Sequence, residues 1–290
     1  FCFLSNKFPC DFLPKFKCLR VLSMSCYFIT ELPESIGNLR LLRYLDLSYT
    51  RIKSLPESLN VLYNLQTLLL CDCADLNNLP ANIGKLINLR HLDISGSGIQ
   101  AMPIGVENLV SLRSLPEFVL GNVGPRGSAT QEMPIGVDNV VTPPFLPEFG
   151  LGIVGSRIDG LRNLSHLQGS LSLSGLENVD NLWDAKNANL KGKQKLTTLV
   201  MEWSSTLSEL QNDRVATDVL EMLQPHQNLE KLTIKGYNGR KFPTWIGDPS
   251  FSKLECLSVT DCKRCRSLPP LGSLLSLKHL YITGMDAVKR

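Results

Sequence analysis

The strongest constraint on the fold is a leucine pattern that returns about every 23 residues. The segment Leu19-x-x-Leu22-x-Met24 recurs from Leu42, Leu65 and Leu89, at steps of 23, 23 and 24 residues. Later copies open at Leu196, Leu229, Leu254 and Leu277, and a weaker copy is Leu171-Ser172-Leu173. A unit this short cannot bury its own apolar face, so neighbouring units must stack into a continuous core.

Each copy of the pattern predicts a short strand. Alternate residues of a strand point to opposite faces, so Leu45 and Leu47 face inward while Tyr44 and Asp46 face outward. Stacked copies place parallel strands about 4.8 Å apart. The predicted fold class is an α/β repeat: a leucine-rich-repeat solenoid of about ten repeats. We expect a curved horseshoe with a parallel β-sheet on the concave face and short helices and turns on the convex face.

The residues between the strands repeat as well. Leu32-Pro33-Glu34-Ser35 returns as Leu55-Pro56-Glu57-Ser58, and proline suits the first position of a short helical turn. Residues 213–223 have helical spacing and precede Pro225, which predicts a true helix on the convex side. Inward polar groups are expected three residues after the second core position of a repeat, where they bond the departing backbone: Thr50, Cys73, Ser97 and Cys262.

One stretch breaks the period. Met102-Pro103-Ile104-Gly105 recurs as Met133-Pro134-Ile135-Gly136, a tandem duplication with a 31-residue step. We expect one copy, within 102–126 or 133–157, to stay in the sheet and the other to loop out. The expected organisation is a single solenoid, truncated at both ends. It has regular repeats over 1–109, an irregular segment over 110–160 and longer repeats over 161–290.

Composition narrows the class of protein. A hydrophobic fraction of 43 % and a charged fraction of 20 % are typical of a folded chain, and a net charge of +3 is too small to indicate nucleic-acid binding. No apolar run reaches the 18 or so residues that a membrane span needs. Nine cysteines without framework spacing, and the single sequon Asn163-Leu164-Ser165, favour a reducing compartment and a cytoplasmic location.

Candidate chemistry is sparse. Cys262-x-x-Cys265 has the spacing of half a zinc site, but a structural site needs two more ligands, so core packing of Cys262 is the expected role. The four histidines are dispersed, and no nucleophile and base can be paired by spacing. We therefore expect no enzyme activity, no metal and no cofactor in this chain.

A small basic cluster lies late in the chain. It comprises Lys263, Arg264 and Arg266, with Arg240, Lys241, Lys231 and Lys235 nearby in the array. A solvated face is the plainest interpretation, a surface for an acidic protein patch is the second, and nucleic acid is the third because interleaved aromatic residues are missing.

The outward strand residues are the candidate protein-binding site. A solenoid usually binds extended partners on its concave face. Leu69 and Trp203 are apolar or aromatic groups at positions predicted to be exposed, and such groups often anchor an interface. Packing of Trp203 against the next, longer repeat is the competing interpretation. The candidates are Val21, Ser23, Tyr44, Asp46, Thr67, Leu69, His91, Asp93, Thr198, Val200, Glu202, Trp203, Lys231, Thr233, Cys256, Ser258, His279 and Tyr281.

Several segments resemble the leucine-rich-repeat region of plant nucleotide-binding disease-resistance proteins of the coiled-coil class. Leu45-Asp46-Leu47-Ser48 is similar to the opening repeats of that family. Leu171 to Val179 looks like its middle segment, as do Leu190-Lys191 with Trp203, and Val219 through His226. Tyr237-x-Gly239-x-x-Phe242-Pro243-x-Trp245 also matches, so the resemblance covers nearly the whole chain.

The resemblance implies an intracellular immune receptor with a signalling coiled coil, a nucleotide-binding switch and these repeats. The repeats would hold the switch inactive, through the receptor's own nucleotide-binding domain, and help to sense a pathogen effector or a guarded host protein. ADP or ATP would bind only in the missing domain, because Gly121 to Gly127 ends without the lysine of a phosphate loop. Two alternatives stay open: an extracellular receptor ectodomain, and an intracellular scaffold or ubiquitin-ligase substrate adaptor.

Overall fold

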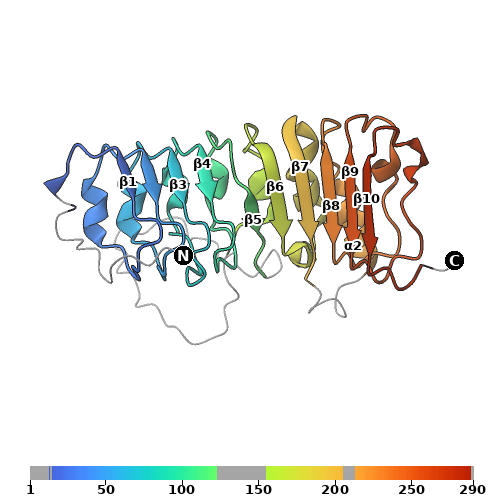
Figure 1. Ribbon diagram of the computed structural model, residues 1–290, viewed down its shortest axis with the longest axis horizontal. Helices are drawn as coiled ribbons and strands as arrows, with labels where there is room; N and C mark the ends of the chain where they lie inside the picture. Colours follow the sequence, from blue (N-terminus) through green and yellow to red (C-terminus); the bar gives the residue numbers. More distant parts are fainter. Residues whose placement is uncertain (1–12, 14, 123–154, 205–212, 289–290) are drawn as a thin grey trace, which may run out of the picture.

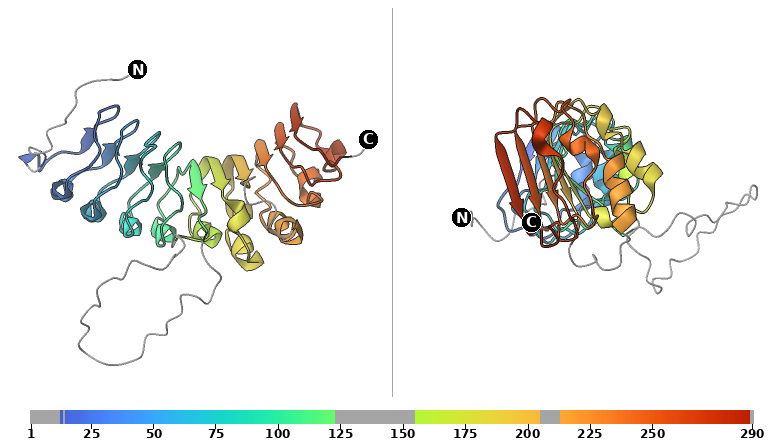
Figure 2. Two further views of the ribbon diagram at one scale, coloured as in Figure 1. Left: turned by 90° about the horizontal axis from the view of Figure 1, so that it is seen from below. Right: turned by 90° about the vertical axis from the view of Figure 1, so that its right-hand side faces the viewer.

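The protein is a curved solenoid, as a computed structural model shows for residues 13, 15–122, 155–204 and 213–288. Within these described residues, ten strands follow one another in chain order (Figure 1). Viewed along the strands, they line the inner side of an arc whose outer side carries the helices (Figure 2). The predicted leucine-rich-repeat fold, with its concave parallel sheet, is confirmed.

The strands form two parallel sheets. The first has the order β1-β2-β3-β4 and the second the order β10-β9-β8-β7-β6-β5. The strands are β1 (Val21–Ser23), β2 (Tyr44–Asp46), β3 (Thr67–Leu69), β4 (His91–Asp93), β5 (Glu117–Val119), β6 (Gln168–Ser174), β7 (Lys195–Glu202), β8 (Lys231–Lys235), β9 (Cys256–Thr260) and β10 (His279–Thr283).

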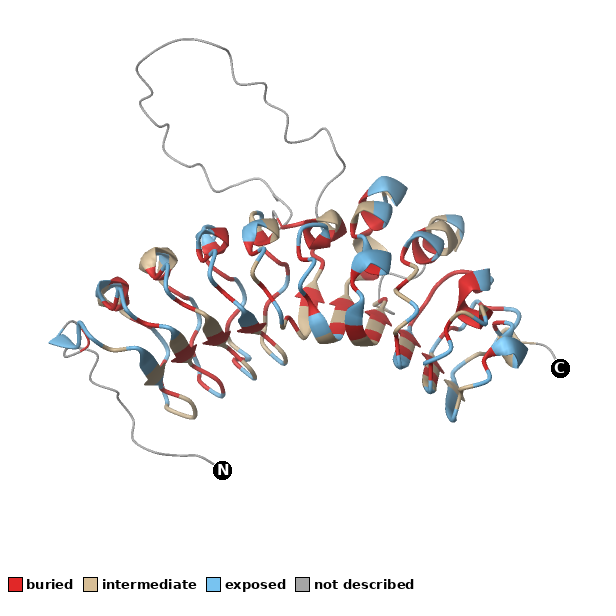
Figure 3. Cartoon of the chain, turned by 90° about the horizontal axis from the view of Figure 1, so that it is seen from above, coloured by how far each residue is buried: buried red, intermediate tan, exposed pale blue. Residues whose placement is uncertain are grey.

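Leucine register holds the sheets together. Leu45 pairs with Leu68, which pairs with Leu92, and all three are completely buried. Along the strands from β2 to β9, buried residues alternate with half-buried or exposed ones (Figure 3). One continuous apolar core runs beneath both sheets, because each leucine column buries its neighbour on either side.

The gap between the two sheets has a cause in the backbone. The pairing of β4 with the next repeat consists of a single bridge, between His91 and Ser114. In that register the Leu92 carbonyl would accept from the N–H of residue 116, but Pro116 has none. The inward residues Leu115 and Phe118 are consequently three positions apart instead of two, and β5 pairs only with β6.

The convex side changes along the chain. Through the first sheet it consists of short 3-10 helices, and later it carries two α-helices (Figure 2). The α-helices are α1 (Leu182–Asn187) and α2 (Asp213–Met222), the second of which confirms the predicted helix. The 3-10 helices are η2 (Glu34–Asn38), η3 (Glu57–Val61), η4 (Ile83–Lys85), η5 (Val106–Asn108), η6 (Ile158–Leu161), η7 (Leu176–Asn178), η8 (Leu190–Gly192), η9 (Thr244–Gly247) and η10 (Leu271–Ser273).

Polar bonds between repeats reinforce the stack. The asparagine before a strand donates from Nδ2 to a carbonyl of the preceding repeat: Asn64 to Arg40 at 2.8 Å, and Asn228 to Gln194 at 3.0 Å. Only some of the predicted inward polar residues bond the neighbouring backbone. Cys73 Sγ lies 3.1 Å from the Leu47 carbonyl and 3.5 Å from Thr50 Oγ1, whereas Ser97 Oγ is buried without a partner among the described residues.

Two further expectations from the sequence concern the duplicated copies and Leu280. The first duplicated copy supplies β5, while the second, from Met133 to Phe149, lies outside the described residues. Leu280 was expected inside, yet it is 45 % exposed because no described strand stacks on the outer side of β10. Among the described residues, no helix has both the length and the apolar character required to span a bilayer.

Candidate functional site on the concave face

The outward residues of the first sheet form two rows across the strands. Val21, Tyr44, Thr67 and His91 are aligned by strand register, as are Ser23, Asp46, Leu69 and Asp93. All eight are half-buried or exposed, as the pattern predicted. Neighbours interact along the rows, since Ser23 Oγ donates to Asp46 Oδ2 at 3.1 Å.

The second sheet carries three such rows. Thr198, Lys231, Cys256 and His279 form the first, Val200, Thr233, Ser258 and Tyr281 the second, and Glu202, Lys235, Thr260 and Thr283 the third. Lys235 Nζ lies 2.6 Å from Glu202 Oε1, and this carboxylate raises the pKa of Lys235. The third row thus contains an ion pair between adjacent strands.

Trp203 is a correction to the sequence analysis. The side chain was assigned to an exposed position of the concave face, but it is only 2 % exposed. It continues the inward series of Leu199 and Met201, and its ring lies edge-on to Tyr237 with centroids 5.2 Å apart. The packing interpretation is therefore correct for most of the ring.

Several residues of the concave face were not predicted from the sequence. Glu117 and Val119 of β5 pair with Ser172 and Ser174 of β6, which extends the outward rows across the second sheet. Burial raises the pKa of Glu117, and nearby Glu202 adds to the rise. Counting alternate residues outward from Leu171 and Leu173 would have found the two serines, whereas the shift at Pro116 hides the β5 pair from such counting.

An arginine column stands at the amino ends of the first strands. It consists of Arg20, Arg43, Arg90 and Arg113, with Gln66 filling the central place. Each of the later residues donates its backbone N–H to the carbonyl of the one before at 2.8 Å. The four side chains are exposed, and no described carboxylate lies within ion-pair distance of them. Strand spacing sets the rise between neighbouring places at about 4.8 Å.

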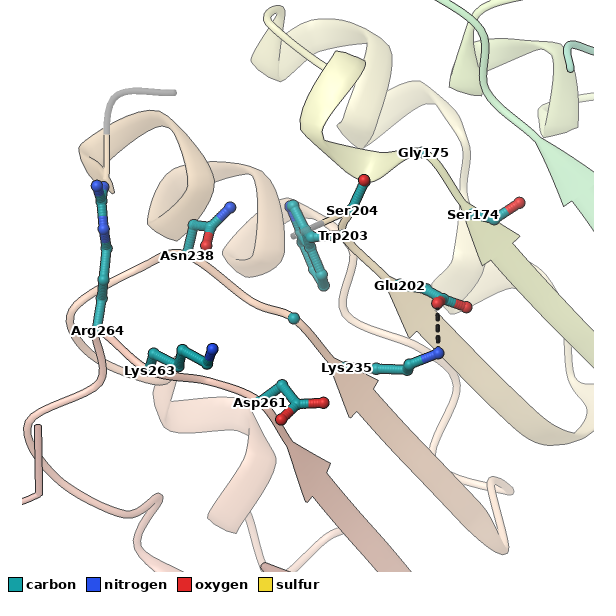
Figure 4. Close-up of a pocket in the computed structure, with 11 residues that line it drawn as sticks. Ser174, Gly175, Glu202, Trp203, Ser204, Lys235, Asn238, Asp261, Lys263 and Arg264 are labelled. Carbon is teal, nitrogen blue, oxygen red and sulfur yellow. Dashed lines mark hydrogen bonds and ion pairs between the residues drawn. The ribbon is translucent and has the colours of Figure 1, made fainter. Parts of the chain in front are cut away.

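A hollow lies at the carboxyl ends of β6 to β9. Its volume is about 630 Å³, and Figure 4 shows the side chains that line it. Ser174 ends β6, Trp203 and Ser204 follow β7, Asn238 follows β8, and Lys263 and Arg264 follow β9. The end of each strand therefore contributes one wall.

The paired cysteines belong to the core. Cys262 and Cys265 are completely buried, and burial raises the pKa of each thiol to about 12. Cys265 Sγ lies 3.1 Å from the Gly239 carbonyl, so its thiol is engaged by the backbone of the preceding repeat. Core packing, the role expected of Cys262, is what the structure shows for both. No group of three or more metal-ligating side chains occurs among the residues that the structure describes.

Two repeat families match the sequence. Residues 158–285 match the family described as R13L1/DRL21 LRRs, and residues 3–132 match a leucine-rich repeat region. Neither is a family of enzymes.

Known plant proteins are similar over nearly the whole chain. A disease resistance protein of Arabidopsis thaliana is 44 % identical over 94 % of this chain and 17 % of its own length. The disease resistance RPP13-like protein 1 of the same plant is 41 % identical over 98 % of this chain and 25 % of its own. The chain thus spans a quarter or less of these relatives. The solved structure of a TDR receptor matches the fold with a TM-score of 0.53 at 19 % identity, over 94 % of this chain and 40 % of that one.

Proposed function

The chain belongs to the leucine-rich-repeat regions of plant disease resistance proteins, and from this premise we propose that it is the protein-binding module of an intracellular immune receptor. The observation that carries the proposal is the set of outward rows on the concave faces of the two sheets, which offers side chains of the ten described strands to a partner. The proposed location is the cytoplasm, in keeping with resistance proteins of this type.

The first sheet is the proposed contact for autoinhibition. The arginine column presents four guanidinium groups that no described carboxylate neutralises. Arginine is well suited to hold carboxylates at an interface because its planar fork can bind them bidentately. An acidic surface of the receptor's own nucleotide-binding domain is the partner we propose for it. The nucleotide itself would bind in that domain and not in these repeats.

The concave face of the second sheet is the proposed sensing surface. Its strands from β6 onward are longer than those of the first sheet. Its outward side chains are mixed in charge, and Lys231, Glu202 and His279 are all accessible. A pathogen effector, or a host protein that the receptor guards, is the proposed ligand.

Co-precipitation tests the autoinhibitory contact. The nucleotide-binding domain of the same receptor should co-precipitate with this chain, and the double substitution R43E and R90E should reduce the retained amount at least about tenfold. Lys85→Glu, exposed on η4 outside the arginine column, is the matched control and should retain binding. Failure of the unchanged chain to bind the domain, or equal loss in the control, would count against the proposal.

A further inference from the structure

The hollow at the carboxyl ends of β6 to β9 contains donors that the fold leaves unused. Trp203 Nε1 and Asn238 Nδ2 are buried and have no hydrogen-bond partner among the described residues. The two residues are 2 % and 7 % exposed, and both line the hollow. Buried donors are almost always satisfied in folded proteins, and an unsatisfied one costs about 1–3 kcal/mol. Two in one place indicate a site that receives an acceptor.

The donors face one another across the hollow. In Figure 4 the indole nitrogen of Trp203 and the amide nitrogen of Asn238 approach the same space from β7 and β8. Trp203 is held by its edge-on contact with Tyr237, whose hydroxyl in turn donates to the Lys241 carbonyl at 2.8 Å. The direction of the indole N–H is therefore fixed before a ligand binds, so binding carries no entropy cost for ordering this donor.

The charges around the hollow favour an anion. Three cations, Lys235, Lys263 and Arg264, accompany two carboxylates, Glu202 and Asp261. Lys235 is already bound to Glu202 at 2.6 Å, and the Asp261 carboxylate lies against Gly284 of the next repeat. Lys263 and Arg264 are exposed and lack an ion-pair partner among the described residues. Two cations are thus available beside two unused neutral donors.

We infer that this hollow binds a carboxylate side chain presented by an acidic segment of a partner protein. A carboxylate accepts up to about four hydrogen bonds, which matches the indole, the amide, the ammonium and the guanidinium. The hollow opens beside the outward rows, so a chain lying on the concave face can insert one acidic residue. Its volume of about 630 Å³ lies within the range of ligand sites.

This inference rests on the proposed function in one respect, that a protein supplies the ligand. It concerns a different surface from the arginine column, so the two can fail separately. Substitutions at Lys263 and Arg264 should leave co-precipitation with the nucleotide-binding domain unchanged.

The Trp203 indole N–H resonance is a direct reporter, because the chain has only three tryptophans and the W203F variant identifies the signal. The probe is an acetylated and amidated tetraglutamate peptide added to the 290-residue chain, with tetraglutamine as its neutral counterpart. We expect a saturable shift of the Trp203 resonance with tetraglutamate and none with tetraglutamine.

Three variants sharpen the result. K263E with R264E, and separately N238A, should weaken tetraglutamate binding at least about tenfold, since each removes charge-assisted or buried bonds to the anion. Arg266→Glu is the control, because Arg266 is exposed and close in sequence but does not line the hollow. Its affinity should change less than about threefold.

Several outcomes would overturn the inference. An unmoved indole resonance, or an equal shift with tetraglutamine, excludes carboxylate recognition at this site. Saturation by inorganic phosphate without any response to tetraglutamate assigns the hollow to phosphate instead. Loss of binding in Arg266→Glu to the same extent as in the paired variant means that the charge of the whole surface, and not the hollow, attracts the peptide.

Discussion

The two sheets solve the same packing problem with different materials. Strands of the first sheet are three residues long, whereas those from β6 onward have five to eight. Among described residues before Phe118, the buried apolar side chains are aliphatic or sulfur-containing. The second half buries Trp203, Tyr237, Trp245 and further aromatic residues.

The convex side explains this difference. Strands stack about 4.8 Å apart, but α-helices with their side chains are about 10 Å across, so α1 and α2 cannot follow the strand spacing. The wider space behind the second sheet is filled by rings, and their polar ends reach α2. Trp245 Nε1 donates to the Leu220 carbonyl at 3.2 Å, and Tyr237 Oη lies 3.3 Å from Thr217 Oγ1. Bulk in the core thus follows from helix width.

The largest expected effect comes from charging the leucine column of the first sheet. Leu68→Asp places a carboxylate where the side chain is 0 % exposed, between Leu45 and Leu92. We expect a loss of at least about 4 kcal/mol of unfolding free energy, because an unpaired buried charge is among the costliest changes. Chemical denaturation measures it.

Thr67→Asp is the matched control for that substitution. Thr67 is the neighbouring outward residue and is half-buried, so its variant should lose less than about 1 kcal/mol. Equal losses in the two variants would mean that the inward assignment of Leu68 is wrong.

Removing a ring should damage the second half alone. Trp203→Ala empties a buried site and should cost about 3–5 kcal/mol. Hydrogen exchange should show loss of protection in β7 and β8 while β2 and β3 keep theirs, because a repeat contacts only its neighbours. Trp183, 68 % exposed on α1, is the comparison: its alanine variant should stay within about 1 kcal/mol. Uniform deprotection of both sheets would contradict the division.

A pH effect of intermediate size should belong to the second half. Lys193 is 1 % exposed and its Nζ donates to the Leu161 and Leu164 carbonyls at 2.8 and 3.0 Å. Burial lowers its pKa to about 8 from the ordinary 10.5. Below about pH 8 the ammonium is charged in both states and its burial opposes folding. Between pH 8 and 10.5 only the unfolded state keeps the proton, so this contribution to the unfolding free energy rises with pH.

The Lys193→Met variant isolates that contribution. The unfolding free energy of the unchanged chain relative to the variant should rise by about 2 kcal/mol between pH 7.5 and 9.5. Titration of buried thiols cancels in the difference because both chains contain them. Lys191→Met, at an exposed position, should show a flat difference. A flat difference for Lys193→Met too would show that the two carbonyls stabilise the ammonium to the same extent as water does.

The smallest effect should be the same in both halves. Asn64→Ala and Asn228→Ala each remove the exposed bond to the preceding repeat, from Nδ2 to a carbonyl at 2.8 and 3.0 Å. Asn228→Ala also removes the exposed bond that Lys253 Nζ donates to Asn228 Oδ1 at 3.0 Å. We expect each to lose about 1 kcal/mol. Thermal unfolding of the two variants checks this, and a loss in one half only would mean that the ladder is not a shared device.

The leucine period was sufficient to predict the strands, their parallel order and most outward residues. Alternation is a local property, so Thr67 and Lys231 could be placed without knowing the rest of the chain. The same rule would have placed Trp203 inside, two positions beyond Met201, but its aromatic character favoured a surface role. The local pattern was the better guide there.

Other features could not be predicted from the period. The division into two sheets depends on one missing N–H at Pro116, in a stretch where the repeat is lost. The hollow depends on how loops after four strands meet, and on which donors they leave unsatisfied. Such relations arise between residues up to 90 positions apart, Ser174 and Arg264 among them, and no spacing rule connects them.

The interrupted ladder at Pro116 has a consequence for how the array comes apart. Each repeat of a solenoid contacts only the repeats beside it. The two sheets can therefore be coupled energetically only through the contacts at this junction. The strand ladder ends at Ser114. The hydrogen bond from the Met102 N–H to the Val119 carbonyl at 2.9 Å, and buried leucines such as Leu112 and Leu115, supply the remainder. The molecule is in this sense two cooperative blocks that are joined mainly by the packing of buried leucines.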